Sequence, residues 1–385
     1  TIKKYKQKIF DVSLLNISFA NGLNSFLIPY LVVIYGFINP SISAEIGIIQ
    51  GTIIFILQIF SSNSRVILLL DSNEKNFENF IFFRSLISII ILTVFYFFFK
   101  DINFIEENFH VPLIFLLLIL WINEITLVFI EKKKLKFLLK AYIFLLIVFY
   151  IFLTLSLFFF KINLNNLFIN FFVINIFVLF YFFNFKYLSG IKYKLKFFYE
   201  NIYSFLSTLS NSISVIFWRY SILYFTNKEL AGLIFAIFSI ASFPGTFFNN
   251  ILGQSVLRNK KLSFYFLKFE NIFYIISLLF LLIIFLFFRL YLTEYFDEFV
   301  INITFMSMIG TIIMIASLRK RHKNLYNFYN NKNVIFKKDI AYSLSIFPLI
   351  IMLFYFNGVD AISFAYLVSS LISYFFYSLN GFKNI

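Results

Sequence analysis

The chain has 385 residues, of which 61% are hydrophobic and 13% are charged. A soluble domain usually contains about 45–50% apolar and about 25% charged residues, so this apolar surplus excludes a soluble globular protein. The chain contains no cysteine, which excludes disulfides, thiolate metal sites and a cysteine nucleophile.

Apolar segments of roughly 20 residues follow one another along the chain, and this is the length that a helix needs to cross about 30 Å of hydrocarbon. No segment-to-segment alternation of apolar and polar residues suggests barrel strands instead. The sequence therefore predicts an all-α polytopic membrane protein with about twelve transmembrane helices. The predicted spans, in chain order, are residues 10–36, 46–70, 80–99, 111–130, 137–160, 166–188, 201–225, 231–254, 270–288, 299–318, 339–356 and 360–380.

The net charge of +15 is distributed unevenly over the connections between these spans. Of the 33 lysines and arginines, 28 lie at the two ends of the chain or near the even-numbered connections. Cytoplasmic loops carry such an excess, so both termini are predicted to be cytoplasmic. These basic residues are explained by topology and by contact with anionic lipid, and nucleic-acid binding is not expected. The odd connections hold only Lys100, Lys161, Lys228 and Arg289.

No motif in the sequence indicates bond-making chemistry. The chain has no Walker loop, no histidine–glutamate pair at zinc spacing and no serine nucleophile elbow. Its outward connections are short, whereas a membrane glycosyltransferase or polysaccharide polymerase needs a large outer loop for its acidic residues. We therefore expect a transport protein without a cofactor or a metal site, rather than an enzyme.

Two predicted spans carry a stripe of polar or small residues at spacings of three and four, which places each stripe on one helix face. Such stripes serve either as packing seams between membrane helices or as the lining of a cavity. Their recurrence at the start of each half of the chain favours a cavity between two lobes. The stripes consist of Ser13, Asn16, Ala20 and Asn24 in the first span, and Ser207, Ser210, Ser214 and Trp218 in the seventh, with Asn211 close by.

The residues around the seventh and eighth spans resemble a known family. Trp218-Arg219 is followed by an apolar run, by a short turn, and by Lys228-Glu229-Leu230-Ala231-Gly232, and then by an apolar helix with Pro244. The first half of the chain contains a similar pattern, with Glu45-Ile46-Gly47 at the start of the second span and Arg65 near its end. The pattern resembles that of O-antigen-type polysaccharide flippases of the multidrug/oligosaccharidyl-lipid/polysaccharide exporter superfamily. The resemblance covers residues 10–70 and 200–260. Two features depart from it: Trp218 replaces an acidic residue, and Glu229 and Gly232 are one residue further apart than usual.

The resemblance implies two six-helix lobes around a central cavity that opens to either side of the membrane in turn. The lobes correspond to residues 1–190 and 198–385, with a cytoplasmic linker at 191–197. The implied substrate is a polyprenyl-pyrophosphate-linked oligosaccharide, moved from the inner to the outer leaflet, and polysaccharide assembly machinery is a possible partner. The alternative is a small-molecule or drug transporter of the same superfamily. A major facilitator is disfavoured because the loop after the second span lacks that class's motif.

Arg219 is the conspicuous charge within a span, and three interpretations remain open for it. Its guanidinium could bind pyrophosphate, reach the outer headgroups, or form a structural ion pair. Glu124, in the fourth span, is expected to pair with Arg65 or Arg84, or to titrate as a coupling site. The residues predicted to line the cavity are Arg219, Asn16, Asn24, Asn211, Ser214 and Trp218.

Overall fold

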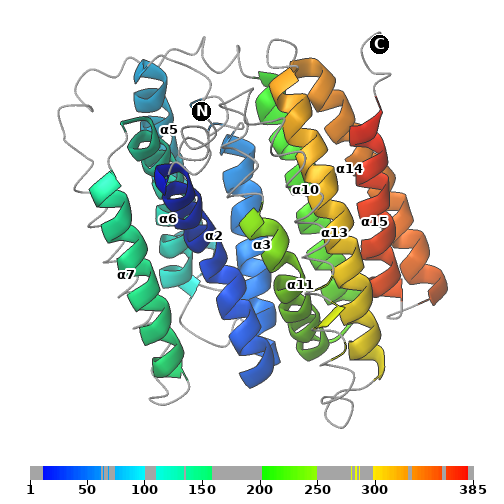
Figure 1. Ribbon diagram of the computed structural model, residues 1–385. Helices are drawn as coiled ribbons and strands as arrows, with labels where there is room; N and C mark the ends of the chain where they lie inside the picture. Colours follow the sequence, from blue (N-terminus) through cyan, green and yellow to red (C-terminus); the bar gives the residue numbers. More distant parts are fainter. Residues whose placement is uncertain are drawn as a thin grey trace, which may run out of the picture. The chain divides into compact units, whose positions relative to one another are not determined.

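A computed structural model describes residues 12–61, 74–99, 110–133, 136–157, 202–248, 298–327, 332–357 and 361–379, with six isolated residues between them at 64, 68, 279, 282, 283 and 286. The described residues form ten long helices and contain no strand, as the sequence predicts (Figure 1). The helices are α2 (Val12–Ile38), α3 (Pro40–Ser61), α5 (Glu74–Phe99), α6 (His110–Lys133), α7 (Lys136–Leu155), α10 (Ile202–Phe225), α11 (Lys228–Phe248), α13 (Glu298–Asn327), α14 (Lys332–Asn357) and α15 (Ala361–Ser378).

Each of these helices overlaps one of the predicted spans. Three contain a stretch both long and apolar enough to cross a membrane: Pro40–Ser61, His110–Val128 and Ile301–Arg321. Four more contain shorter apolar stretches: Gly22–Ile38, Phe80–Phe95, Leu139–Leu155 and Phe364–Ser378. The predicted span at 166–188 lies outside the described residues, and the span at 270–288 lies almost wholly outside them.

Asparagine side chains begin two of the helices in the same way. Asn39 precedes Pro40, and its side-chain oxygen accepts a hydrogen bond of 3.4 Å from the backbone N–H of Ile42. Asn227 precedes Lys228, and its side-chain oxygen accepts one of 2.7 Å from Leu230. Asparagine is a favoured N-cap because it satisfies a backbone donor that has no partner within the helix. The α2–α3 and α10–α11 hairpins therefore turn with the same capping chemistry, which fits the predicted repeat of spans one and two in spans seven and eight.

The chain divides into two compact units, and the first comprises residues 1–25 and 52–208. Within it α6 packs against both α5 and α7. A sealed cluster of Leu68, Phe80, Ile125 and Val128 forms part of its core, with Ile81 packed against it. Residues of this kind bury their apolar surface between helices rather than against lipid.

The second unit comprises residues 26–51 and 209–385. Here α13 packs along α15 and against α11, and α14 packs against α15. Ala241 and Met308 form a core cluster, with Ile312 packed against it. The second unit thus includes the α2–α3 turn, although this turn lies early in the sequence. The predicted linker at 191–197 lies outside the described residues.

Candidate functional site

Arg219 lies in the second unit and points toward α3 rather than toward the end of its own helix. Its guanidinium donates to the backbone oxygen of Gly47 and, at 3.2 Å, to the side-chain oxygen of Gln50. Its Cζ lies 5.8 Å from the centre of the Phe235 ring, on α11. Gly51 makes room for the side chain, since a Cβ at that position would lie 2.7 Å from the Arg219 Cδ. The guanidinium therefore lies between α3, α10 and α11, which disfavours a simple snorkelling role.

All polar partners of Arg219 in the described part of the chain are neutral. A carbonyl and an amide accept two of its hydrogen bonds, while a guanidinium carries five N–H donors. No described carboxylate is paired with it. A cation that is partly buried without a counter-charge is costly to maintain, and such groups commonly mark functional sites in membrane proteins. The third interpretation from the sequence, a structural ion pair, has no support among the described residues.

Close backbone approach joins α3 to α11 beside Arg219. A side chain at Gly232 would overlap the carbonyl of Pro40, and one at Gly36 would overlap Ala236. Ala44 and Gly232 are each the fifth residue of their helix, and a Cβ on Gly232 would lie 3.0 Å from the Ala44 nitrogen. We call these five residues the α3–α11 seam; Gly36 belongs to the last turn of α2, and the other four belong to α3 and α11. Small residues allow such contact between membrane helices.

Hydrogen bonds of Ser43 and an ion pair of Glu45 stabilise the α3–α11 seam. The Ser43 hydroxyl oxygen lies 2.8 Å from the carbonyl oxygen of Val32 and 3.1 Å from that of Gly232. The Lys228 ammonium forms an ion pair of 2.5 Å with Glu45, whose side chain is 5% exposed. Glu45, the first residue of the motif Glu45-Ile46-Gly47, thus has a specific basic partner. Glu229, by contrast, is exposed.

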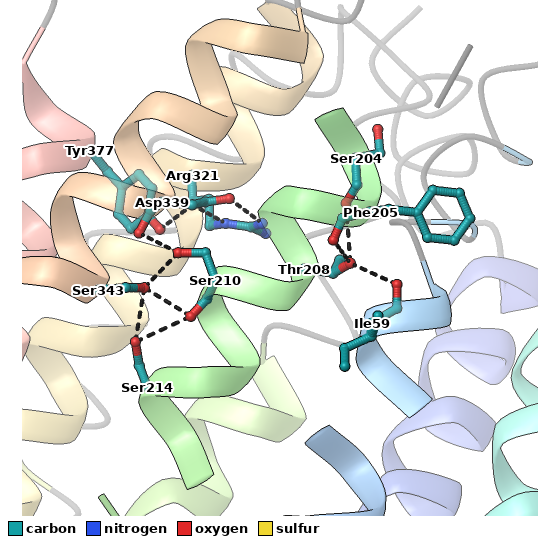
Figure 2. A network of polar contacts seen from close by, with 10 residues as sticks. All are labelled: Ile59, Ser204, Phe205, Thr208, Ser210, Ser214, Arg321, Asp339, Ser343 and Tyr377. Carbon is teal, nitrogen blue, oxygen red and sulfur yellow. Dashed lines mark hydrogen bonds and ion pairs between the residues drawn. The ribbon is translucent and has the colours of Figure 1, made fainter. Parts of the chain in front are cut away.

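Ser210 and Ser214, two residues of the polar stripe of the seventh span, face α14 in the second unit (Figure 2). The Ser210 hydroxyl donates to the Ser343 hydroxyl at 2.8 Å, and that of Ser214 does so at 2.9 Å. Ser343 in turn contacts the backbone oxygen of Ser210 at 2.9 Å. Both α10 serines are buried, with exposed fractions of 8% and 6%. The hydroxyls of Ser210 and Ser214 are thus engaged in helix packing, the alternative that the sequence left open.

A buried ion pair continues this network toward α13 and α15 (Figure 2). Arg321 holds Asp339 through two parallel hydrogen bonds of 3.0 and 2.9 Å, and the Tyr377 hydroxyl also donates to this carboxylate. Asn211, with its amide oriented to suit its neighbours, accepts from the Arg321 Nη2 at 3.0 Å. This cluster could not be foreseen from the sequence, because Arg321 and Asp339 lie among many basic residues whose positions are explained by topology.

A second buried cluster lies in the first unit and contains Glu124. Arg84, fully buried, donates to Glu124 at 3.0 Å and to the Ser64 hydroxyl at 2.5 Å. Its Cζ lies 4.6 Å from the centre of the Trp121 ring, and the indole N–H of Trp121 donates to Ser61 at 2.7 Å. Glu124 is therefore paired with one of the two arginines that the sequence suggested. Arg65, the other, lies outside the described residues.

Asn24 also belongs to the first unit, where its side chain is 7% exposed. Its amide nitrogen lies 3.4 Å from the Leu120 carbonyl, and its oxygen accepts from the Tyr142 hydroxyl at 2.8 Å. These contacts join α2 to α6 and α7. Asn16 lies in α2, but its side chain is not among those described.

Of the predicted cavity residues whose side chains the structure describes, Arg219 and Trp218 are half-buried neighbours on α10, while Asn24, Asn211 and Ser214 take part in the polar contacts between helices given above. Trp218 packs with Phe238 and Tyr366 at ring-centre distances of 5.9 and 6.2 Å. The sequence alone could not single out Phe238 and Tyr366 as partners of Trp218, because the chain contains 63 phenylalanines and 24 tyrosines.

Comparison with solved structures shows the fold. The chain is similar to an outward-facing multidrug resistance MATE family transporter of the MOP superfamily, at 12% identity and a TM-score of 0.61, over 94% of this chain and 92% of that one. A eukaryotic MATE transporter matches at 12% identity and a TM-score of 0.64, over 99% and 97%. A MOP superfamily transporter from Pyrococcus furiosus matches at 14% identity and 0.54, over 95% and 94%.

These likenesses establish a MATE transporter fold, that of a multi-pass membrane protein. No family model matches the sequence, and no curated relative does. Identities this low indicate the fold without the substrate. The choice between a polysaccharide flippase and a drug transporter therefore depends on the chemistry of the site.

Proposed function

We propose that this chain is a secondary transporter that moves polyprenyl-pyrophosphate-linked oligosaccharide from the inner to the outer leaflet of the bacterial cytoplasmic membrane. The MATE fold supports transport by alternating access. The observation that carries the choice of substrate is Arg219, a partly buried guanidinium whose described polar partners are both neutral.

A pyrophosphate is the kind of ligand that suits this guanidinium. Hydrogen bonds between a guanidinium and a phosphate oxygen are charge-assisted and roughly twice as strong as neutral ones. The planar fork of Arg219 can bind two phosphate oxygens at once. An incoming anion therefore competes well with the Gly47 carbonyl and the Gln50 amide, and also supplies the missing counter-charge.

Three ion-paired carboxylates in the described helices argue against a cationic drug as the substrate. Three acidic side chains in the described helices are each paired with a basic residue: Glu45 with Lys228, Glu124 with Arg84, and Asp339 with Arg321. None of the three is left to attract a cation, whereas Arg219 is left to attract an anion. The solved Pyrococcus furiosus transporter has a binding pocket of reverse polarity that suggests a different function, so pocket charge is not constant in this fold.

Transport in proteoliposomes tests the proposal. The full chain is reconstituted with a fluorescent polyprenyl-pyrophosphate-linked trisaccharide, and exposure of the label is followed with a membrane-impermeant quencher. We expect the label to cross faster than in empty vesicles, and ethidium, as a cationic drug, not to be moved. Movement of ethidium without movement of the trisaccharide would establish the drug-transporter alternative.

A matched pair of variants connects the result to the site. Arg219→Gln keeps a polar side chain of similar reach but removes the charge, and it is expected to lower trisaccharide movement at least tenfold. Arg319→Gln makes the same change at a half-buried arginine of α13 and is expected to stay within twofold of the natural chain.

A further inference from the structure

Three aromatic rings from three helices form a cluster beside Arg219. Trp218 of α10, Phe238 of α11 and Tyr366 of α15 lie with ring centres 5.9, 6.2 and 4.9 Å apart. Their planes are tilted by 38° to 49°, so no ring covers the face of another completely. All three residues are half-buried, while Ala241, Ala365 and Ile362 nearby in sequence are sealed. The rings therefore retain surface that the protein does not cover.

The ring of Tyr366 is held in place by contacts with α13. A Cβ on Gly310 of α13 would lie 2.7 Å from the Tyr366 Cδ1, so only glycine lets the ring pack this closely. The Tyr366 hydroxyl lies 3.4 Å from the hydroxyl of Thr311 on the same helix. A ring held in this way offers a preformed surface, which reduces the entropic cost of binding.

The two tryptophans of the chain differ in their hydrogen bonding. The indole N–H of Trp121 donates to Ser61 at 2.7 Å, whereas that of the half-buried Trp218 has no partner among the described residues. Tryptophans in protein interiors usually find a partner for this group. Together with the uncovered ring surface, this donor leaves the cluster able to contact a polar ligand.

The aromatic cluster and the guanidinium converge on α11. Arg219 and Trp218 are adjacent on α10, so their side chains diverge by about 100°. Both nevertheless contact α11: Arg219 lies over the ring of Phe235, and Trp218 packs against Phe238, which follows Phe235 by about one helical turn. A ligand that contacts the guanidinium is therefore close to the three rings.

We infer that Trp218, Phe238 and Tyr366 bind the saccharide of the substrate, stacking against the apolar C–H face of the pyranose ring next to the pyrophosphate. This inference rests on the proposed function. The electron-rich faces of aromatic rings attract the weakly positive C–H groups of a sugar. The Trp218 N–H donates to a sugar hydroxyl, and Arg219 holds the phosphate. The rings thus bind the sugar, and the guanidinium binds the negatively charged phosphate.

Two soluble probes separate these roles. One is N-acetylglucosamine linked through pyrophosphate to a ten-carbon isoprenyl chain, and the other is the same isoprenyl pyrophosphate without sugar. Binding of each is measured by calorimetry on the full chain in detergent. We expect the sugar-bearing probe to bind at least tenfold more tightly. Tyr366→Leu is expected to abolish that advantage while changing the affinity for the sugarless probe less than twofold.

Three further variants test the assignment. Tyr366→Phe keeps the ring and is expected to stay within threefold of the natural chain, so a loss there contradicts stacking. Tyr342→Leu removes a ring of another aromatic pair, with Tyr377, and is expected to leave the sugar advantage intact. Arg219→Gln is expected to weaken both probes.

The outcomes distinguish this inference from the proposed function. If Tyr366→Leu and Trp218→Leu leave the sugar advantage unchanged while Arg219→Gln weakens both probes, the rings are core packing only and the inference fails alone. If neither probe binds to the natural chain, the proposed function fails and the inference with it.

Discussion

The Lys228 ammonium lies 2.5 Å from Glu45 and links the first residue of α11 to the sixth residue of α3. This ion pair lies beside the close packing of the α3–α11 seam, at the end that the charge distribution predicts to face outward. Under the proposed function, we expect the seam to separate when the chain opens to that side, and the ion pair to re-form on closing.

Cross-linking of the α3–α11 seam is expected to stop transport reversibly. The natural chain has no cysteine, so Glu45→Cys with Lys228→Cys creates a single reactive pair. A short bifunctional methanethiosulfonate reagent should abolish trisaccharide movement in proteoliposomes, and a reductant should restore it. Full transport by the cross-linked protein would show that the seam does not open. Each single cysteine variant, treated in the same way, is the control.

Enlarging Gly232 is expected to destabilise the protein. A methyl group at this position overlaps the Pro40 carbonyl, and overpacking typically costs about 1–3 kcal/mol. Gly232→Ala should therefore lower the melting temperature in detergent. Val215→Ala, on an exposed part of α10, should change it little, and equal effects of the two substitutions would contradict the close packing.

Removing Glu124 is expected to destabilise the first unit because it leaves the sealed Arg84 charge uncompensated. Loss of one partner of a buried pair costs about 3–5 kcal/mol, and the partial exposure of Glu124 places the expected value at the lower end. Thermal unfolding of Glu124→Gln should show this loss, and the added substitution Arg84→Met should recover part of it. An unchanged melting temperature, together with loss of dependence on a pH gradient, would instead identify Glu124 as a coupling site.

Cysteine labelling is expected to separate the packing seam of α10 from the anion site. Ser214→Cys replaces a sealed hydroxyl bonded to Ser343 and should resist a membrane-impermeant maleimide. Arg219→Cys, at a partly exposed position, should react faster in the detergent-solubilised chain. Equal labelling of both would mean that the serine stripe lines an accessible cavity.

The helical architecture could be predicted because a membrane span leaves a strong local signal. Apolar segments of the right length identified the described helices, and the asparagine caps of α3 and α11 agree with the repeat. For Glu124 the sequence left Arg65 and Arg84 open as partners, and the ion pair with Arg84 shows which of the two it contacts among the described residues.

The division of residues into units could not be predicted in the same way. Residues 26–51 join the second unit through glycine contacts that leave no periodic pattern, since Gly36 and Gly232 matter only through the partner each meets. A stripe of serines looks the same in a sequence whether it faces a cavity or another helix. For Ser210 and Ser214, the hydrogen bonds to Ser343 favour the packing alternative, and these bonds could not be foreseen from the sequence.

Recognition of the negative charge of the substrate by Arg219 can be measured by changing that charge. Proteoliposomes receive either the pyrophosphate-linked trisaccharide or the same trisaccharide joined to the same polyprenyl chain by a neutral ether. We expect the natural chain to move the pyrophosphate form at least tenfold faster, Arg219→Gln to lose this preference, and Arg219→Lys to keep part of it. An equal preference in the natural chain and in Arg219→Gln would show that Arg219 does not recognise the charge.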